Sequence, residues 1–541
     1  MHRTRTTALL LTALAAAAPL AAQGAKAAPA STKPAKPAKA AASAKPAPAL
    51  ERAAATITAA DVARKVGIIA HDSMQGRDTP SRGLDLTAQY LAGEYKRLGL
   101  QPGGENGTWF QRYGITRRRL LPAASTILLK SGTNVATIRL DQGARFIQGV
   151  VPAGPVEGDV VVLGGGLTAE GASALPLAGK VAAYVADFRT KEAADRSTQV
   201  VRALRAARPA AVLVVSNRPA ADFARTQALQ ANERTVLGDN PTGLAALEVL
   251  DTAVAGLLRA HGVELAAVRA SAQPYSAPAA RITARIELKD SLVSRQTAPN
   301  VVAILPGSDP KLKNEYVVFS AHMDHVGVAG PKGSGGCEAR GADSICNGAD
   351  DDASGTIGVL ELAEAFAQPG ARPKRSLVFL QVSGEEKGLW GSQYFAEHPT
   401  VDMKNVVANV NIDMIGRNWA DTIVAIGKEH SDLGATLNRV NAAHPELRMT
   451  AIDDMWPEER FYFRSDHYNF ARKGVPILFF FNGVHTDYHQ VGDAPDKIDS
   501  EKESRILKLL FWLGQDVANT PARPKWTAES YAEIVEGPGG R

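Results

Sequence analysis

Four apolar, strand-like segments alternate with helix-like segments in the second half of the chain. The strand-like segments are 316–320 (YVVFS), 375–382 (RSLVFLQV), 406–412 (VVANVNI) and 475–481 (VPILFFF), and a helix-like run covers 356–366. Strands that are apolar along their whole length are buried on both faces, so helices must cover both sides of the sheet. The pattern predicts an α/β fold of three layers, with a mixed, largely parallel sheet between layers of helices.

Side chains that can bind cations come after each of these segments. They are His322, Glu385, Glu386, Asp413 and His489. Each alone has an ordinary explanation, such as a helix cap, a solvated surface or a structural histidine. In a parallel sheet, however, ligands bind beyond the carboxyl ends of the strands. Carboxylates clustered there without a cation would cost several kcal/mol, and histidine with carboxylate is a ligand set that suits zinc.

Three consecutive aspartates precede the helix-like run 356–366, within NGADDDASG at 347–355. One explanation is a solvated loop in which the last aspartate or Ser354 caps the helix. The other is a cation in front of the carboxylates, because adjacent negative charges repel one another and each prefers water to a protein interior.

Six sequence segments extend this pattern to a known family. They are FSAHMDHVG, NGADDDASG, VSGEEKGLWGS, NIDMIGR, RSDHYNFARKGVP and DYHQVGDAPDKID. In order and approximate spacing, over about residues 295–515, they resemble the co-catalytic zinc metallopeptidases that include secreted bacterial aminopeptidases and glutamate carboxypeptidases. Residues 59–113, including MQGR, resemble the start of these proteins. The segment 140–275 resembles an inserted protease-associated (PA) domain.

The resemblance implies a zinc peptidase fold with two zinc ions and a defined ligand set. His322 and Asp413 would bind one ion, Glu386 and His489 would bind the other, and Asp351 would bridge both. This would give the middle aspartate of the three its positive partner.

Three further residues have roles in this scheme. Asp324 lies two residues after His322, on the same side of an extended strand, and is expected to accept the other N–H of that imidazole. The resemblance implies that Glu385 is the general base for a water molecule held between the zinc ions. Tyr488 would donate its hydroxyl to the oxyanion that develops during attack.

The resemblance therefore implies a secreted zinc-dependent aminopeptidase that removes N-terminal residues from peptides. A carboxypeptidase or dipeptidase of the same family is the alternative, and it would need a cationic clamp, for which Arg417 and Arg464 are candidates. A glutaminyl cyclase and a non-catalytic binding homologue are weaker alternatives.

The remaining histidines have no expected ligand role: His325, His398, His430, His444 and His485. Ser465, Asp466 and His467 are expected to shape the pocket.

The N-terminal region has the composition of an export signal followed by a linker. Two arginines precede an apolar run at 8–22, and an Ala/Pro/Lys-rich stretch comes next. The first 50 residues hold seven of the basic side chains and no acid, so the formal charge of +5 leaves −2 for the rest. The charge of the remaining chain therefore predicts no nucleic-acid surface. The apolar run is short for a membrane span and no cysteine follows it, so no stable membrane anchor is expected. The expected divisions are a signal peptide (1–28), a linker (29–50), a catalytic domain (51–139 and 276–520), the insertion (140–275) and a tail (521–541).

The chain has two cysteines, Cys337 and Cys346, which are close together in a glycine-rich segment. An exported protein can keep a disulfide, and a local bridge between these two is plausible. A metal site formed by the pair lacks the tight spacing and the further cysteine or histidine partners that zinc requires.

Overall fold

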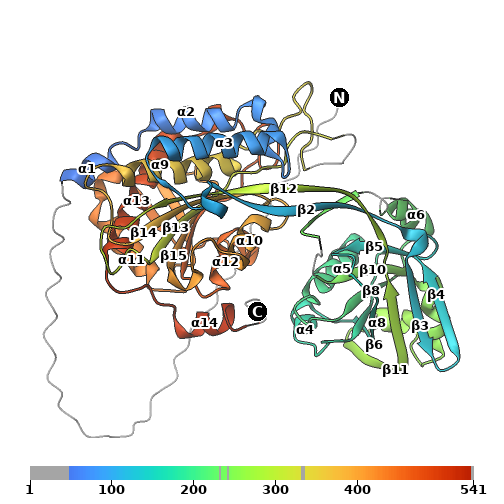
Figure 1. Ribbon diagram of the computed structural model, residues 1–541. Coiled ribbons are helices and arrows are strands. Elements are labelled where there is room, and N and C mark those ends of the chain that lie inside the picture. Colours follow the sequence, from blue (N-terminus) through green and yellow to red (C-terminus); the bar gives the residue numbers. More distant parts are fainter. Residues whose placement is uncertain (1–47, 229, 231–232, 240–242, 331–335, 538–541) are drawn as a thin grey trace, which may run out of the picture. The chain divides into compact units, whose positions relative to one another are not determined.

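The computed structural model describes residues 48–537, apart from 229, 231–232, 240–242 and 331–335 (Figure 1). The predicted signal peptide and nearly all of the predicted linker lie outside these residues. In the described part of the chain, no helix is both long enough and apolar enough to cross a membrane.

The first of two large sheets contains the strand-like segments that the sequence predicted. In spatial order its strands are β17 (Thr450–Ile452), β16 (Thr422–Ile426), β18 (Ile477–Phe480), β15 (Val406–Ile412), β13 (Tyr316–His322), β14 (Ser376–Val382), β12 (Asp290–Leu305), β2 (Phe110–Leu120) and β9 (Glu233–Leu237), with β1 (Gln101–Pro102) beside β12. The central strands β18, β15, β13 and β14 run parallel, whereas β12, β2 and β9 are antiparallel. The predicted mixed α/β sheet is confirmed, with parallel pairing concentrated at its centre.

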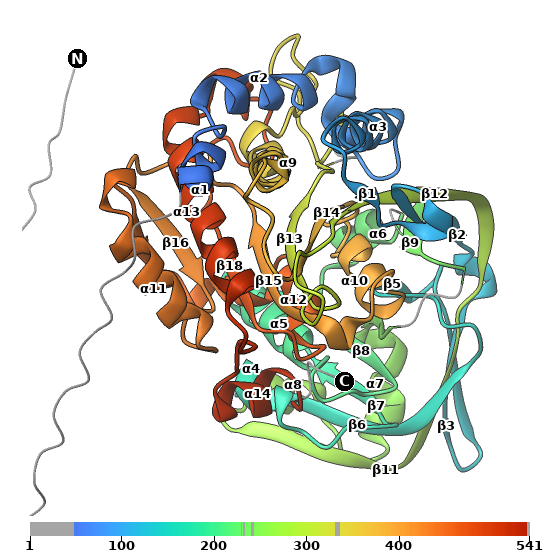
Figure 2. The same ribbon diagram turned by 60° about the vertical axis from the view of Figure 1, so that its left-hand side comes forward.

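Helices cover both faces of this sheet (Figure 2). One core contains residues of α1 (Pro48–Ala54), α2 (Ala59–Ile69), α3 (Arg82–Arg97), α9 (Gly355–Ala367), α11 (Leu433–Ala443) and α13 (Ser500–Asn519). The other contains residues of α10 (Trp390–Glu397), α12 (His467–Ala471) and α14 (Ala528–Ile534). Successive residues of β13 alternate between these cores, Val317 and Phe319 in the first and Val318 in the second. Burial on both faces explains why these strands are continuously apolar.

Side-chain caps fix where several of these helices begin. Thr58 accepts a hydrogen bond from the Asp61 amide at the start of α2, and Ser81 accepts one from the Leu84 amide at the start of α3. Asp499 does the same for α13. Each cap satisfies an N–H group that has no partner within its helix, which stabilises the helix by about 1 kcal/mol.

The second sheet is formed largely by the segment between β2 and β12. Its strands, in spatial order, are β4 (Asn134–Arg139), β3 (Thr126–Ser131), β11 (Pro274–Glu287), β6 (Val156–Gly165), β7 (Val181–Val185), β8 (Ala211–Ser216), β10 (Ala245–Leu250) and β5 (Ala144–Gln148). The helices in this part of the chain are α4 (Ala169–Ser173), α5 (Lys191–Ala203), α6 (Ala220–Ala228), α7 (Asp251–Arg259) and α8 (Leu265–Ala270). Strands β3 and β4 precede residue 140, and β9 joins the first sheet. The domain boundaries and the PA-like character of 140–275 stay predictions.

Candidate metal centre

The carboxyl ends of the central strands bring the five predicted metal ligands together. His322 ends β13, Asp413 comes directly after β15, and Glu386 and His489 lie in the loops after β14 and β18. Asp351 lies in the irregular turn Ala349–Ser354, directly before α9. The strand order therefore gathers side chains that are far apart in sequence at one edge of the sheet.

The five side chains form two groups that share Asp351. Oδ1 of Asp351 lies 3.4 Å from His322 Nε2, which in turn lies 3.6 Å from Asp413 Oδ1. Oδ2 of Asp351 lies 3.1 Å from His489 Nε2, which in turn lies 3.2 Å from Glu386 Oε1. Each carboxylate oxygen of Asp351 thus faces a different group, as a residue that bridges two cations requires.

The electrostatics of these groups favour a cation. Oδ2 of Asp351 and Nε2 of His489 are buried and lack a hydrogen-bond partner of good geometry among the described residues. Burial opposes protonation of His489, but its contacts with Asp351 and Glu386 outweigh burial and raise its pKa to about 10. Buried charges in proteins are paired or coordinate metals. The donor atoms, imidazole nitrogen and carboxylate oxygen at separations of 3.1–3.6 Å, fit zinc.

The outer two aspartates of the predicted trio hold the loops that carry the other ligands. Asp352 accepts hydrogen bonds from the main-chain N–H of His322 (3.1 Å) and of Met414 (3.1 Å), the residue after Asp413. It also accepts from the Gly355 amide at 2.9 Å, as the predicted cap of α9 would. Asp350 accepts from the Gly416 amide at 2.6 Å. The peptide bond between Asp351 and Asp352 is cis.

Asp324 connects His322 to Glu385, but not through the predicted bond. Nδ1 of His322 lies 3.2 Å from the main-chain oxygen of Asp324 and 3.8 Å from its carboxylate. The carboxylate instead accepts hydrogen bonds from the Glu385 amide (3.2 Å) and the Thr79 hydroxyl (3.0 Å). The main-chain oxygen of Asp324, rather than its carboxylate, is therefore the nearer acceptor for the His322 imidazole. Burial raises the pKa of Asp324 to about 6.

Glu385 and Tyr488 face the same pocket as the first group of ligands. Burial raises the pKa of both the Glu385 carboxyl and the Tyr488 hydroxyl. The Tyr488 ring stacks on His489 with the ring centroids 3.9 Å apart. Arg464 also lines the pocket. The rest of the wall is mainly apolar: Met414, Phe461, Phe479, Phe481 and Val484.

Of the residues that were expected to shape the pocket, Ser465 lines it, and all three are buried. The Ser465 hydroxyl donates to Asp413 Oδ2 at 2.9 Å, and Nε2 of His467 lies 2.7 Å from the Tyr462 carbonyl oxygen. Asp466 is fully buried. Ser465 therefore supports a predicted ligand directly.

Asp493, which had no expected role, holds the turn that carries Asp351. Its carboxylate accepts hydrogen bonds from the main-chain amides of Asp350 and Asp351, each at about 3.0 Å. Burial and the neighbouring Asp350 raise the pKa of Asp493 to about 6. The only sequence feature that pointed to a role for Asp493 was its place in the segment DYHQVGDAPDKID. Its hydrogen-bond partners are main-chain amides, which every residue except proline has, so no partner side chain can be found in the sequence.

Arg77, in the MQGR segment, is a second structural support that the sequence did not identify. Its fully buried guanidinium donates to four main-chain oxygens: Met323 (2.9 Å), Ile69 (2.9 Å), Asn347 (2.6 Å) and Gly348 (2.8 Å). Met323 is the residue after His322, and Asn347 and Gly348 begin the segment that contains the aspartates. Arg77 therefore joins the end of α2 to both ligand-bearing loops.

We expect Arg77→Lys to lower the free energy of unfolding by about 2–4 kcal/mol, because an ammonium cannot reach all four carbonyls and each one left unpaired costs about 1–3 kcal/mol. Zinc binding should weaken as the loops loosen. Thermal unfolding and zinc titration measure both effects. Arg64→Lys is the matched control, because this α2 side chain is 57% exposed and should change stability by less than about 0.5 kcal/mol. Equal behaviour of the two variants would contradict this role.

Of the five histidines for which no ligand role was expected, His325 contacts the second ligand group, which contains Glu386 and His489. Its Nδ1 lies 3.0 Å from Glu386 Oε1 and 3.6 Å from Asp351 Oδ2. Nε2 of His485 lies 3.3 Å from Asp350 Oδ2. The others are elsewhere: His398 stacks on Tyr394, His430 contacts Ser530, and His444 stacks on Trp512.

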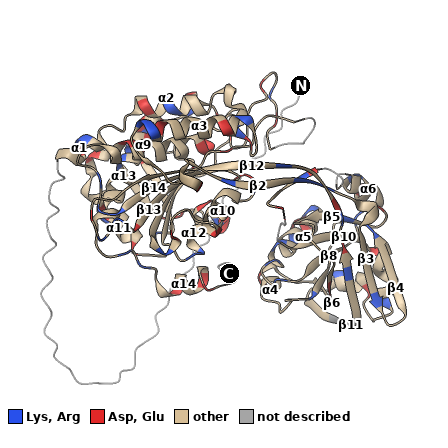
Figure 3. Cartoon of the chain, viewed as in Figure 1, with Lys and Arg blue, Asp and Glu red and all other residues tan. Residues whose placement is uncertain are grey.

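A third acidic group, Asp61, Glu361 and Glu364, has a positive partner in the protein itself. Nζ of the buried Lys65 lies 2.9, 2.5 and 2.8 Å from these three carboxylates. Acidic and basic residues lie next to one another on α2, α3 and α9 (Figure 3). This group is therefore an ion-pair cluster that joins α2 to α9 rather than a metal site.

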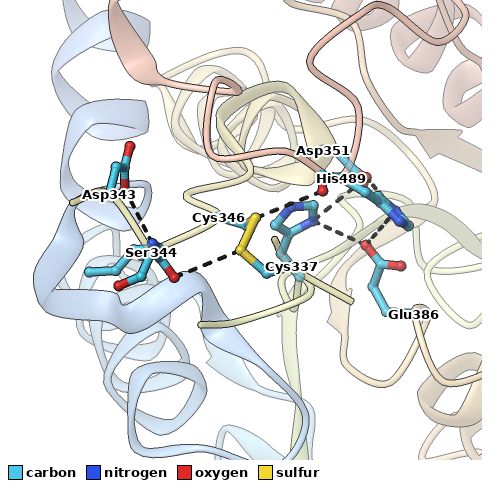
Figure 4. Close-up of a disulfide and its surroundings, with 9 residues drawn as sticks. Cys337, Asp343, Ser344, Cys346, Asp351, Glu386 and His489 are labelled. Carbon is cyan, nitrogen blue, oxygen red and sulfur yellow. Dashed lines mark hydrogen bonds and ion pairs between the residues drawn. A yellow bond between two sulfur atoms is a disulfide. The ribbon is translucent and has the colours of Figure 1, made fainter. Parts of the chain in front are cut away.

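The predicted pair of cysteines forms a disulfide beside the second group of ligands. The sulfur atoms of Cys337 and Cys346 are 2.11 Å apart, and Cys346 Sγ lies 3.8 Å from the main-chain oxygen of His489 (Figure 4). Cys346 directly precedes the segment 347–355 that contains Asp351. The disulfide therefore anchors one end of that segment next to the loop of His489.

Comparisons with known proteins agree with this geometry. The segment 300–512, which contains all five predicted ligands, matches the model of Peptidase family M28. A probable leucine aminopeptidase of Trichophyton verrucosum (strain HKI 0517) is 28% identical over 228 residues, which cover 41% of this chain and 58% of that relative. A probable zinc metalloprotease of Pyricularia oryzae (strain 70-15) is 28% identical over 268 residues, covering 41% of this chain and 50% of the relative.

Among solved structures, an aminopeptidase from Aneurinibacillus sp. strain AM-1 is similar over 88% of this chain and 97% of that chain, with 19% identity and a TM-score of 0.46. The chain spans little more than half the length of the curated relatives above. The match of residues 300–512 to Peptidase family M28 confirms the predicted resemblance to zinc metallopeptidases.

Proposed function

We propose that this protein is a zinc-dependent aminopeptidase that removes N-terminal residues from peptides. The observation that carries the proposal is the position of Asp351, whose two carboxylate oxygens face two separate ligand groups beside a pocket that Glu385 and Tyr488 also line. Zinc metalloproteases and leucine aminopeptidases among the relatives support the same activity.

Two zinc ions fit the two ligand groups. His322 and Asp413 would hold one, Glu386 and His489 the other, and Asp351 would contact both. When bound, zinc supplies Lewis acidity, which polarises a peptide carbonyl and makes a water molecule more acidic.

The protein side chains would then move protons and stabilise charge. The Glu385 carboxylate accepts a proton from the attacking water and returns it to the leaving amine as the C–N bond breaks. The main-chain amide of Glu385 donates a hydrogen bond to the Asp324 carboxylate, which positions the backbone from which the Glu385 side chain extends. The Tyr488 hydroxyl donates a hydrogen bond to the oxyanion that forms on the carbonyl carbon. The ring of Tyr488 is fixed by its stacking on His489.

The surroundings of the pocket favour a substrate with a free amine and an apolar first side chain. Asp351, Glu385 and Asp413 line the pocket, and their negative charge would favour a cationic α-amine over an anionic group. Phe461, Phe479 and Phe481 also line the pocket, so an apolar side chain can be buried against them.

A carboxypeptidase is the second candidate, and one observation favours it. Arg464 lines the pocket, where it could bind a substrate carboxylate. Its Nη1 lies 3.3 Å from Glu459 Oε2, so it already has an acidic partner. Arg417, the other predicted clamp, pairs with Asp487 at 3.1 Å.

A panel of chromogenic substrates separates these candidates. We expect leucyl-p-nitroanilide to be hydrolysed at least about 10-fold faster in kcat/KM than lysyl-p-nitroanilide, because one or two buried apolar groups contribute about 1–3 kcal/mol. N-acetyl-leucyl-p-nitroanilide should not be hydrolysed. Release of C-terminal residues from N-acetylated peptides, with no turnover of the nitroanilides, would instead establish the carboxypeptidase.

We also propose that the protein is exported by a cleaved signal peptide within residues 1–28. The two arginines, the apolar run and the small residues after it support this proposal, as does the Cys337–Cys346 disulfide. We propose that the 140–275 segment is an inserted PA-like domain that affects access of longer peptides.

A further inference from the structure

His325 is fully buried beside the second ligand group, although no ligand role was expected for it. Its Nδ1 lies within hydrogen-bond distance, 3.0 Å, of Glu386 Oε1. The rings of His325 and His489 contact each other edge to face, with their centroids 5.5 Å apart and their planes at 78°. His325 therefore contacts both residues that would hold the second ion.

The orientation of the His325 ring is fixed by close packing. Gly348 lies against it, and a Cβ atom at that position would come within 2.5 Å of two ring carbons. Gly348 has φ of +56°, which also favours glycine. The His325 amide donates to the carbonyl oxygen of Arg77 at 3.3 Å. The backbone and the ring are thus both held, and Nδ1 is aimed at Glu386.

The surroundings of the other ring nitrogen indicate which atom carries the hydrogen. A histidine that binds a metal usually donates its second N–H to an acceptor, as His322 can to the Asp324 carbonyl at 3.2 Å. Nε2 of His325 is buried and has no hydrogen-bond partner among the described residues. An ionised carboxylate can only accept hydrogen bonds, so the 3.0 Å contact between His325 Nδ1 and Glu386 Oε1 needs the hydrogen on Nδ1. The proton therefore belongs on Nδ1.

We infer that His325 is a positioning residue, which donates its Nδ1–H to Glu386 Oε1 and holds this carboxylate beside Asp351 and His489. This inference rests on the proposed function, because it assigns Glu386 to the second zinc ion. A carboxylate held in place loses less freedom when it binds the ion. Removal of such a supporting hydrogen bond typically lowers metal affinity by about 10–100-fold.

Three substitutions of His325 test the inference. His325→Asn places an amide N–H close to the position of Nδ1, whereas His325→Gln places it near the position of Nε2, and His325→Leu removes the donor altogether. Zinc affinity is measured by competition with a metallochromic chelator, which does not depend on turnover. We expect the Leu and Gln variants to bind the second equivalent of zinc about 10–100-fold more weakly than wild type, with the first equivalent retained. The Asn variant should stay within a few-fold of wild type.

The contrast between Asn and Gln remains informative if the Leu variant does not fold. Wild-type affinity in the Gln variant, or an Asn variant as weak as the Gln variant, would overturn the inference. Loss of the second ion in all three variants, as complete as in Glu386→Ala, would identify His325 as a direct ligand. If wild-type protein itself binds no zinc or hydrolyses no peptide, the proposed function fails instead.

Discussion

Replacement of Glu385 by glutamine is expected to lower kcat by about 10²–10⁴-fold while the zinc content stays unchanged. Glutamine has nearly the shape of glutamate but cannot accept the proton of the attacking water. The Glu385 side chain faces the pocket, and its carboxylate is absent from both ligand groups. The loss should therefore fall on turnover rather than on metal binding. Steady-state kinetics on leucyl-p-nitroanilide and metal analysis of the same preparation measure both quantities.

The neighbouring residue supplies the matched control. Glu386 lies 3.2 Å from His489 Nε2, so Glu386→Gln should weaken binding of the second zinc ion and lose activity for that reason. Added zinc should restore part of the activity of Glu386→Gln and none of the activity of Glu385→Gln. A Glu385→Gln protein as active as wild type would show that another group is the base.

Replacement of Asp351 by asparagine is expected to abolish activity and to release both zinc ions during purification. Each oxygen of this carboxylate faces one ligand group, whereas asparagine offers one neutral oxygen and an N–H₂ that cannot bind a cation. We expect zinc affinity to fall by more than about 100-fold, beyond the effect of losing a supporting residue. Isothermal titration of zinc into the metal-free protein measures the loss.

The adjacent aspartate gives the control for this prediction. Asp350 accepts a hydrogen bond from the Gly416 amide, and the oxygen of asparagine can still accept it. Asp350→Asn should therefore keep most of its zinc and activity. If Asp350→Asn loses as much zinc as Asp351→Asn, the division of roles within the three aspartates is wrong.

The sequence was sufficient to predict the central strands of the first sheet and the gathering of the predicted ligands at their carboxyl ends. Strands buried on both faces show as continuous apolar runs, and residues just beyond the carboxyl ends of parallel strands meet at one edge of the sheet. His322, Asp413 and Glu386 were identifiable because each comes within a few residues of such a strand. His489 also follows such a strand, and Asp351 was a candidate because it lies among three consecutive aspartates. The assignment of all five as ligands depended on the resemblance to a family. Their roles as metal ligands stay predictions until metal is measured.

The supporting contacts could not be predicted in the same way. Arg77 and Asp493 act on main-chain carbonyls and amides, which nearly every residue possesses, so the sequence contains no complementary side chain to find. His325 looked like a structural histidine because its partner, Glu386, is 61 residues away. In place of the hydrogen bond expected between His322 and the Asp324 carboxylate, the structure has one to the Asp324 carbonyl. Strand β9, far along the chain from its neighbour β2, likewise left no sequence pattern of its pairing.

The zinc content of active wild-type protein tests the central claim most directly. Mass spectrometry of the metal in a preparation of known active fraction should give two zinc ions per chain. Removal with a chelator should abolish hydrolysis of leucyl-p-nitroanilide, and two equivalents of zinc should restore it. Full activity with fewer than one ion per chain, or in the presence of excess chelator after complete metal removal, would contradict the shared role of Asp351.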